Sequence, residues 1–207
     1  MQIVYEDAAL VVCLKPPGVL STDEPGGVPE LLREQLGLRE LRTVHRLDRV
    51  VGGLMALAKN AQTASELSRQ IREGGFEKRY LAVVHGLTEK RGELRDLLAR
   101  DRVKCLTYVA DAPGKGVQEA VLRFETLGYA EGLSLVRIEL LTGRTHQIRC
   151  QFSARGLPLV GDRKYGLPGD ECAIALWSHE LAFAHPGDGR ALRFTAAPPA
   201  ERPWALF

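Results

Sequence analysis

Short strand-like segments joined by tight turns recur along the chain, and they constrain its fold more than any other feature. Two antiparallel hairpins are predicted, from residues 2–6 with 10–15 and from 181–183 with 192–194. Further strands are predicted at 54–58, 78–84, 120–124 and 133–140. Only residues 91–116 are polar and irregular, and we expect a variable loop there. Because strand signals outnumber helical ones, the sequence predicts an α+β fold on a mixed, largely antiparallel sheet.

Three helices are predicted between these strands. The first begins near Pro29 and is closed by Gly37. The second carries apolar residues at three- and four-residue steps, with Asn60 as its N-cap and Gly74 at its end. The third follows a strand-to-helix turn, and Thr145 is expected to cap it.

The composition is that of a water-soluble globular chain, with 45% apolar and 26% charged residues. No run of about eighteen apolar residues predicts a membrane span, and the start of the chain resembles no export signal. We therefore expect a cytoplasmic protein whose four scattered cysteines are reduced and mostly buried. The five histidines show no metal-ligand spacing, so no metal site is predicted.

Basic residues gather in three stretches of the chain, although the net charge is only +2. The clusters lie at residues 39–49, 69–79 and 144–164. If folding brings them together, they form a basic cleft suited to nucleic acid. Taken singly, each cluster is equally well explained as a solvated face.

The stretch from His45 to Leu54 is the most unusual in composition. On an extended backbone, Arg46 and Asp48 point to the same side, and neighbouring arginines keep an aspartate ionised. The pair Gly52–Gly53 permits either a turn with positive φ or the close approach of another backbone. An anionic nucleophile or base beside a tight turn is a plausible reaction centre. The alternative is a surface ion pair at the mouth of a hairpin.

A second charged segment, residues 140–149, combines two arginines, a histidine and a glutamine at the start of a predicted helix. Guanidinium groups and exposed helix amides both favour anions. By itself, this segment fits any phosphate-binding turn.

Taken in order, these motifs resemble the RluA family of pseudouridine synthases. The resemblance extends over nearly the whole chain and rests on Lys15–Gly18, His45–Asp48 with Gly53–Leu54, Lys78–Tyr80, Gly143–Arg149, Pro158–Asp162 with Tyr165–Gly166, and His185–Pro186. It implies one catalytic domain over residues 1–207 with a central active-site cleft, and no S4-type RNA-binding module. The chain departs from the family at Val51–Gly52, where Thr-Ser is more usual.

The resemblance implies that selected uridines of ribosomal or transfer RNA are isomerised to pseudouridine. The N-glycosidic bond breaks, the uracil rotates, and a carbon–carbon bond replaces it. The family requires no cofactor and no metal, and we expect RNA as the partner of a monomer. Asp48 matches the catalytic aspartate. Attack on the ribose and assistance to a glycal intermediate are both open routes.

The remaining site residues also follow from the resemblance. Arg144 matches the partner of the aspartate, Tyr80 the ring that packs on uracil, and Arg46 the wedge that fills the gap left by the flipped nucleotide. The predicted substrate-binding residues are Arg46, Arg49, Lys78, Ile148 and Arg149. His45 and His146 are expected to be structural, and Lys15 is left outside the site.

Other function classes fit the residues less well. A glycosidase normally needs a second placed carboxylate, and Asp162 is only a distant candidate. An RNA-binding module of the same fold without isomerase activity has no need of Asp48. A kinase catalytic loop is excluded because no glycine-rich ATP loop precedes His45.

Overall fold

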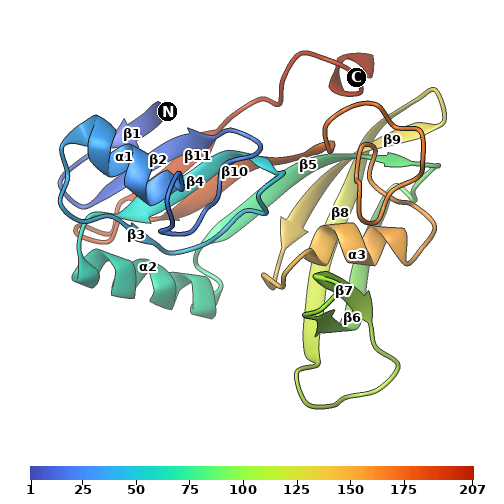
Figure 1. Cartoon of the computed structure of the whole chain (residues 1–207), viewed down its shortest axis with the longest axis horizontal. Coiled ribbons are helices and arrows are strands. Elements are labelled where there is room, and N and C mark those ends of the chain that lie inside the picture. Colours follow the sequence, from blue (N-terminus) through green and yellow to red (C-terminus); the bar gives the residue numbers. More distant parts are fainter. The chain divides into compact units, whose positions relative to one another are not determined.

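The computed structural model describes all 207 residues. All of the predicted strands form, and the chain divides into two compact units. Unit 1 comprises Met1–Lys78 and Trp177–Ala197, and unit 2 comprises Arg79–Leu176 and Pro198–Phe207. Figure 1 labels the helices and strands of both units and colours them by residue number. The predicted α+β class is confirmed.

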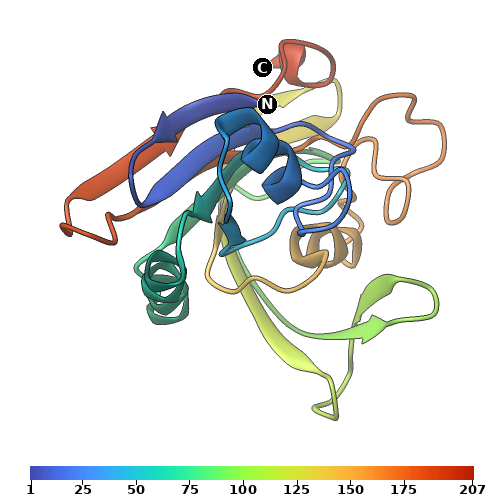
Figure 2. The ribbon, with the colours of Figure 1, turned by 60° about the vertical axis from the view of Figure 1, so that its left-hand side comes forward.

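Unit 1 is built on a mixed set of strands. In order of pairing they are β1 (Gln2–Glu6), β2 (Leu10–Lys15), β4 (Gly52–Ala58) and β10 (Leu176–Ala184), with β3 (Arg42–Thr43) on β4 and β11 (Ala191–Thr195) on β10. Strands β4 and β10 run parallel, whereas the other pairs are antiparallel. Both predicted hairpins, β1–β2 and β10–β11, are confirmed (Figure 2).

Strands β2 and β4 are buried on both faces because a helix covers each side. Helix α1 (Val28–Leu36) contributes Leu32 to a cluster with Val11, Cys13, Met55 and Leu57. Helix α2 (Ala61–Glu73) contributes Leu67 to a cluster with the alternate residues Leu10, Val12, Leu54 and Ala56. Figure 1 shows the two helices on opposite sides of these strands. Each fully buried leucine contributes roughly 1.5–3 kcal/mol to the stability of this core.

The predicted ends of these two helices are confirmed. The side chain of Asn60 accepts a hydrogen bond from the Thr63 N–H at 2.8 Å, which satisfies a donor at the start of α2. Gly37 and Gly74 end α1 and α2 in the left-handed conformation.

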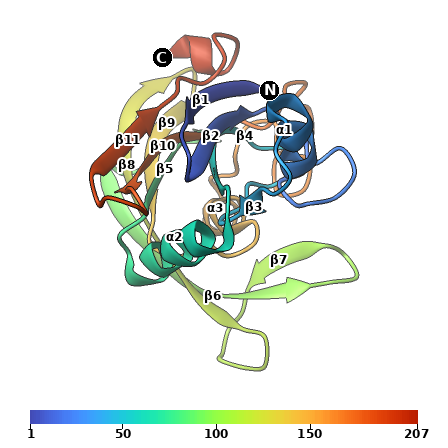
Figure 3. The same ribbon diagram turned by 90° about the vertical axis from the view of Figure 1, so that its left-hand side faces the viewer.

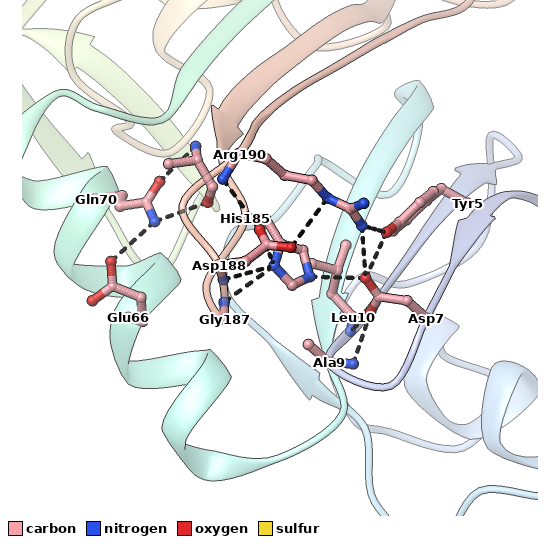
Figure 4. Close-up of polar contacts among 11 residues, drawn as sticks. Tyr5, Asp7, Ala9, Leu10, Glu66, Gln70, His185, Gly187, Asp188 and Arg190 are labelled. Carbon is pink, nitrogen blue, oxygen red and sulfur yellow. Dashed lines mark hydrogen bonds and ion pairs between the residues drawn. The ribbon is translucent and has the colours of Figure 1, made fainter.

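A polar cluster joins the turns of the two hairpins (Figure 4). His185 Nε2 lies 2.8 Å from the Asp7 carboxylate, which also accepts the backbone N–H groups of Ala9 and Leu10. Burial by itself raises the pKa of Asp7, but these hydrogen bonds and one from Tyr5 outweigh it and lower the pKa to about 2. The ionised Asp7 carboxylate therefore holds the turn of the β1–β2 hairpin against the turn of the β10–β11 hairpin.

Unit 2 is an antiparallel sheet covered by one helix. The pairing order is β5 (Glu77–His85), β9 (Leu133–Leu140), β8 (Gln118–Ala130), β6 (Arg91–Asp101) and β7 (Leu106–Val109), and the first two residues of β5 belong to unit 1. Helix α3 (Gln147–Ser153) packs Phe152 edge-on against Phe124, with ring centroids 5.5 Å apart. A short 3-10 helix, Trp204–Leu206, lies near the C-terminal end.

The predicted loop at 91–116 is wrong, because β6 and β7 form a hairpin there (Figure 3). Leu94 and Leu98 are buried on one face of β6, whereas its alternate residues form ion pairs with β8. These pairs are Arg91–Glu125, Arg95–Glu119 and Arg123–Glu93, with N···O distances of 2.7, 2.8 and 3.0 Å. Opposite charges on neighbouring strands support pairing even where the sequence looks too polar for a strand.

The predicted N-cap of α3 is also wrong. His146, not Thr145, occupies the N-cap position, with a left-handed φ of 53°. The side chain of Gln147 replaces a conventional cap, since its Oε1 accepts hydrogen bonds from the Arg144 N–H at 3.0 Å and the Thr142 hydroxyl at 2.8 Å. The turn is therefore closed by a residue inside the helix.

All four cysteines are free thiols, as predicted, but only two are buried. Cys13 and Cys150 lie in the cores, Cys172 is half-buried, and Cys105 is exposed. None of the helices has the length and apolar content needed to cross a membrane.

Candidate active site

The eight predicted site residues are drawn equally from the two units. Unit 1 contains Arg46, Asp48, Arg49 and Lys78, and unit 2 contains Tyr80, Arg144, Ile148 and Arg149. The predicted pairing of Asp48 with Arg144 stays a prediction.

Asp48 lies on a segment between β3 and β4 that belongs to no strand or helix. Leu47 is buried, whereas Arg46 is exposed and Asp48 half-buried, which matches the alternation expected of an extended backbone. The Asp48 carbonyl accepts the Val51 N–H at 3.0 Å, so a tight turn follows the aspartate directly. The carboxylate is therefore at the edge of a turn, with its flanking leucine anchored in the core.

The glycine pair after this turn allows the close approach that the sequence predicted. Gly53 has a φ of +115°, and a Cβ on it would lie 2.4 Å from the Ser178 carbonyl oxygen of β10. A Cβ on Gly52 would lie 2.5 Å from the ring of Trp177. Glycine is required at both positions because β10, which pairs with β4 there, leaves no room for a Cβ.

Lys15 is a residue of this region that the sequence analysis left out. Its side chain is fully buried, and its Nζ donates to the carbonyls of Pro16, Val19 and Arg49 at 2.9, 2.7 and 3.1 Å. Burial lowers the pKa of Lys15 to about 8, while the negative charge of Asp48 opposes that shift. The ammonium group therefore holds the Asp48 turn to the end of β2. The motif Lys15–Gly18 is visible in the sequence, but it does not reveal that Lys15 binds a carbonyl 34 positions away.

The lowered pKa of Lys15 makes stability depend on pH. The unfolded chain keeps this proton up to about pH 10.5, whereas the folded chain releases it near pH 8. The unfolded state therefore binds more protons between these values, and stability rises with pH in that window. Relative to Lys15→Met, the wild type should gain up to about 3 kcal/mol of unfolding free energy from pH 8 to 10.5.

Denaturant unfolding at several pH values measures this gain. The exposed Lys115 provides a control, because Lys115→Met should run parallel to the wild type across the window. Parallel curves for the wild type and Lys15→Met would contradict the assigned environment of Lys15.

The other cations of unit 1 differ in exposure. Arg46 and Arg49 are exposed, and Arg49 Nε donates to the Gly18 carbonyl at 2.8 Å. Lys78 is half-buried, and burial lowers its pKa. Exposed guanidinium groups are accessible to an RNA ligand. The predicted role of Arg46 as a wedge and the predicted substrate contact of Arg49 stay predictions.

The two histidines next to the charged motifs have structural hydrogen bonds. His45 Nε2 accepts the Ala56 N–H of β4 at 3.0 Å, and its Nδ1 is shielded from solvent. Burial lowers the pKa of His45 to about 3, so the ring is neutral at physiological pH. In unit 2, His146 Nδ1 lies 2.9 Å from the Tyr165 hydroxyl. These contacts agree with the structural roles predicted for both histidines.

In unit 2, the predicted residues lie on β5 and around the start of α3. Tyr80 is 5% exposed and lies opposite Ile138 in the β5–β9 pairing. Arg144 is half-buried in the turn before α3, where its Nε donates to the Glu119 carbonyl at 2.9 Å. Ile148 is buried within α3.

Arg149 is buried in an ion pair with Asp162. Its Nε and one terminal nitrogen each lie 2.7 Å from a carboxylate oxygen, and the two side chains are 4% and 0% exposed. The Arg149 guanidinium also stacks over the ring of Tyr165, 5.1 Å from its centroid. Such a pair fixes the guanidinium in one orientation, and the predicted contact of Arg149 with RNA stays a prediction.

The same pair weakens the glycosidase alternative. Burial by itself raises the pKa of Asp162, but Arg149 and the N–H groups of Lys164 and Tyr165 outweigh it and lower the pKa. A carboxylate held ionised in this way is unsuited to act as the general acid that a glycosidase needs.

Comparison with known proteins shows the family of the chain. The family described as RNA pseudouridylate synthase matches residues 9–154. The uncharacterized RNA pseudouridine synthase YlyB of Bacillus subtilis is 33% identical over 215 residues, covering 97% of this chain and 70% of that protein. The dual-specificity RNA pseudouridine synthase RluA of Pasteurella multocida is 33% identical over 214 residues, covering 96% and 93%.

Two further relatives extend this result. The ribosomal large subunit pseudouridine synthase D of Zymomonas mobilis is 30% identical over 225 residues, covering 97% of this chain and 70% of that protein. The solved human RNA pseudouridylate synthase domain containing 1 has a TM-score of 0.81 at 25% identity, covering 96% of this chain and 83% of that one. Since sequence and fold agree over nearly the full length, the chain belongs to the RluA family of RNA pseudouridine synthases, enzymes that isomerise uridine in RNA to pseudouridine.

Proposed function

We propose that Asp48 is the catalytic aspartate of this isomerase. The observation that carries the proposal is the setting of its segment. Asp48 is half-buried beside a tight turn, the Lys15 ammonium binds the Arg49 carbonyl after it, and the Ala56 N–H of β4 binds the His45 ring before it. Catalysis requires a reacting group held within a fraction of an ångström, and fixed backbone on either side supplies that. The position of Asp48 in the motif His45–Asp48 supports the same assignment.

The reaction makes specific demands on the other residues. The target uridine must leave its stack, which costs roughly a few kcal/mol. In this proposal Arg46 fills the vacated place, and Tyr80 packs on the uracil, where base stacking returns roughly 1–3 kcal/mol. The bond from uracil N1 to the ribose C1′ breaks, the base rotates, and C5 bonds to C1′. The C5 hydrogen leaves as a proton, and N1 gains a proton. Direct attack by Asp48 and a glycal route both satisfy this balance.

The substrate class follows from the relatives. One relative is named for the ribosomal large subunit, which supports ribosomal RNA as the substrate, and another is named for dual specificity, which supports a second class of RNA. We propose transfer RNA as that second class. We propose that the enzyme acts as a cytoplasmic monomer, that its two units serve one catalytic domain, and that it needs no metal or cofactor, because the isomerisation exchanges only protons with its surroundings. Arg49, Lys78, Ile148 and Arg149 are its proposed substrate contacts.

Mapping pseudouridines in total RNA from cells with and without this protein tests the function. A site that is lost without the protein and restored by its return identifies the substrate. If no site changes, an RNA-binding role without isomerase activity gains support instead.

Replacing Arg144 with alanine should remove activity while the fold remains. Removal of one preorganised donor from an active site lowers turnover by about 10²–10³-fold in other enzymes, and we expect a loss of that order here. The half-buried side chain makes one hydrogen bond, from Nε to the Glu119 carbonyl, so the unfolding midpoint should move little. Turnover and thermal unfolding are measured on the same preparations, with Arg123→Ala on the exposed face of β8 as the control. Unfolding of Arg144→Ala at ordinary temperature would instead assign Arg144 a structural role.

A further inference from the structure

The backbone that carries Asp48 is held by a neighbouring loop rather than by a regular strand. Residues 16–27, between β2 and α1, supply the partners. The Gly18 N–H donates to the Arg49 carbonyl at 2.7 Å, and Arg49 Nε returns a bond to the Gly18 carbonyl at 2.8 Å. The loop therefore fixes the residue that follows Asp48.

Ser21 fixes the residue that precedes Asp48. Its hydroxyl donates to the Leu47 carbonyl at 2.8 Å and lies 3.1 Å from the Leu47 nitrogen, whose N–H it accepts. Ser21 is 4% exposed and Leu47 is 6% exposed, so water cannot readily replace either bond. One buried hydroxyl thus satisfies both backbone groups of Leu47.

We propose that Ser21 is a positioning residue for catalysis, which sets the orientation of Asp48 through the Leu47 backbone. The proposal rests on the catalytic role of Asp48 stated above. Without the hydroxyl, a buried N–H and a buried C=O lose their partner, and the segment must shift to recover one. A shift of about 1 Å at a reacting group can cost about 10²-fold in rate.

The neighbouring residue Thr22 provides a matched control. It carries the same hydroxyl group in the same loop, but its Oγ1 donates to the exposed Glu24 carboxylate at 2.6 Å. Removing that hydroxyl leaves the Asp48 segment untouched. The variants are therefore Ser21→Ala, Ser21→Thr, which keeps a hydroxyl, and Thr22→Ala.

The experiment measures pseudouridine formation as a function of RNA concentration, with total RNA from cells lacking the protein as substrate and at a temperature well below unfolding. For Ser21→Ala we expect a maximal rate about 10²-fold lower, with the half-saturating RNA concentration within about twofold of wild type. Ser21→Thr should recover at least tenfold of that loss, and Thr22→Ala should match the wild type. Amide hydrogen exchange at Leu47 should quicken in Ser21→Ala and stay unchanged in Thr22→Ala.

Three results would overturn the role of Ser21. They are a wild-type rate in Ser21→Ala, a changed half-saturating concentration at unchanged maximal rate, and equal Leu47 exchange in Ser21→Ala and wild type. If Ser21→Ala is too unstable to assay, the rate and exchange of Ser21→Thr decide, since a loss of rate despite wild-type exchange contradicts the proposal. Asp48→Asn in the same assay separates the two claims, because an active Asp48→Asn overturns the catalytic assignment, and an inactive one with a fully active Ser21→Ala overturns only the positioning role.

Discussion

Asp48→Asn is expected to abolish pseudouridine formation and to leave RNA binding intact. Asparagine has nearly the same shape, so the turn that begins at Asp48 is retained, but an amide can neither attack the ribose nor take up a proton from it. Removal of a negative charge also cannot weaken contacts to phosphate. Conversion of uridine in RNA and equilibrium RNA binding, measured on the same protein, check both halves of this expectation.

The control for this variant is Asp23→Asn. Asp23 lies in the same unit but is exposed and pairs with Arg33, so its loss should change neither activity nor binding. Full isomerase activity in Asp48→Asn would show that another group carries the reaction.

Asp162→Asn is expected to lower the free energy of unfolding by about 3–5 kcal/mol. The carboxylate is 0% exposed, and its removal leaves the Arg149 guanidinium buried with a weaker partner. The N–H groups of Lys164 and Tyr165, which donate to the same carboxylate, also lose part of their bonding. Denaturant unfolding followed by a probe in unit 2 measures the change.

A control on the same unit is Glu93→Gln, which breaks exposed ion pairs with Arg95 and Arg123. Exposed pairs contribute little because water already solvates both charges, so its effect should be much smaller. Equal stability losses in Glu93→Gln and Asp162→Asn would contradict the burial assigned to the Arg149–Asp162 pair.

Local signals predicted most of the fold. The hairpins and the caps at Asn60, Gly37 and Gly74 depend on residues close together in the sequence, and all of them form. One error arose where distant residues decide the structure. Strand β6 is polar because its charges pair with β8, about 24 to 34 positions away, and no local pattern reveals those partners.

The start of α3 shows a second kind of error. Thr145 is a conventional N-cap residue by type, but Gln147 closes the turn from inside the helix. This arrangement places His146 at positive φ, which few residues other than glycine adopt. The general preference for threonine at N-caps therefore predicted Thr145, one position before the actual N-cap, His146.

The sequence points to the proposed reacting group, Asp48, but not to the residues that hold its backbone. Asp48 and the Gly52–Gly53 pair stand out because their residue types are unusual in that order. Lys15 and Ser21 do not, because they bind backbone carbonyls 34 and 26 positions away. Every residue has a backbone carbonyl, so no residue type in the sequence marks the partner. Such supports become visible only once the chain is folded.

Release of the hydrogen at uracil C5 tests the central claim most directly. Bonding of C5 to the ribose C1′ expels that hydrogen, whereas RNA binding and simple bond hydrolysis leave it in place. Total RNA labelled with tritium at uracil C5, from cells lacking the protein, is incubated with wild type and with Asp48→Asn. The account predicts tritium release to water by the wild type alone. Equal release by Asp48→Asn, or none by the wild type, would contradict it.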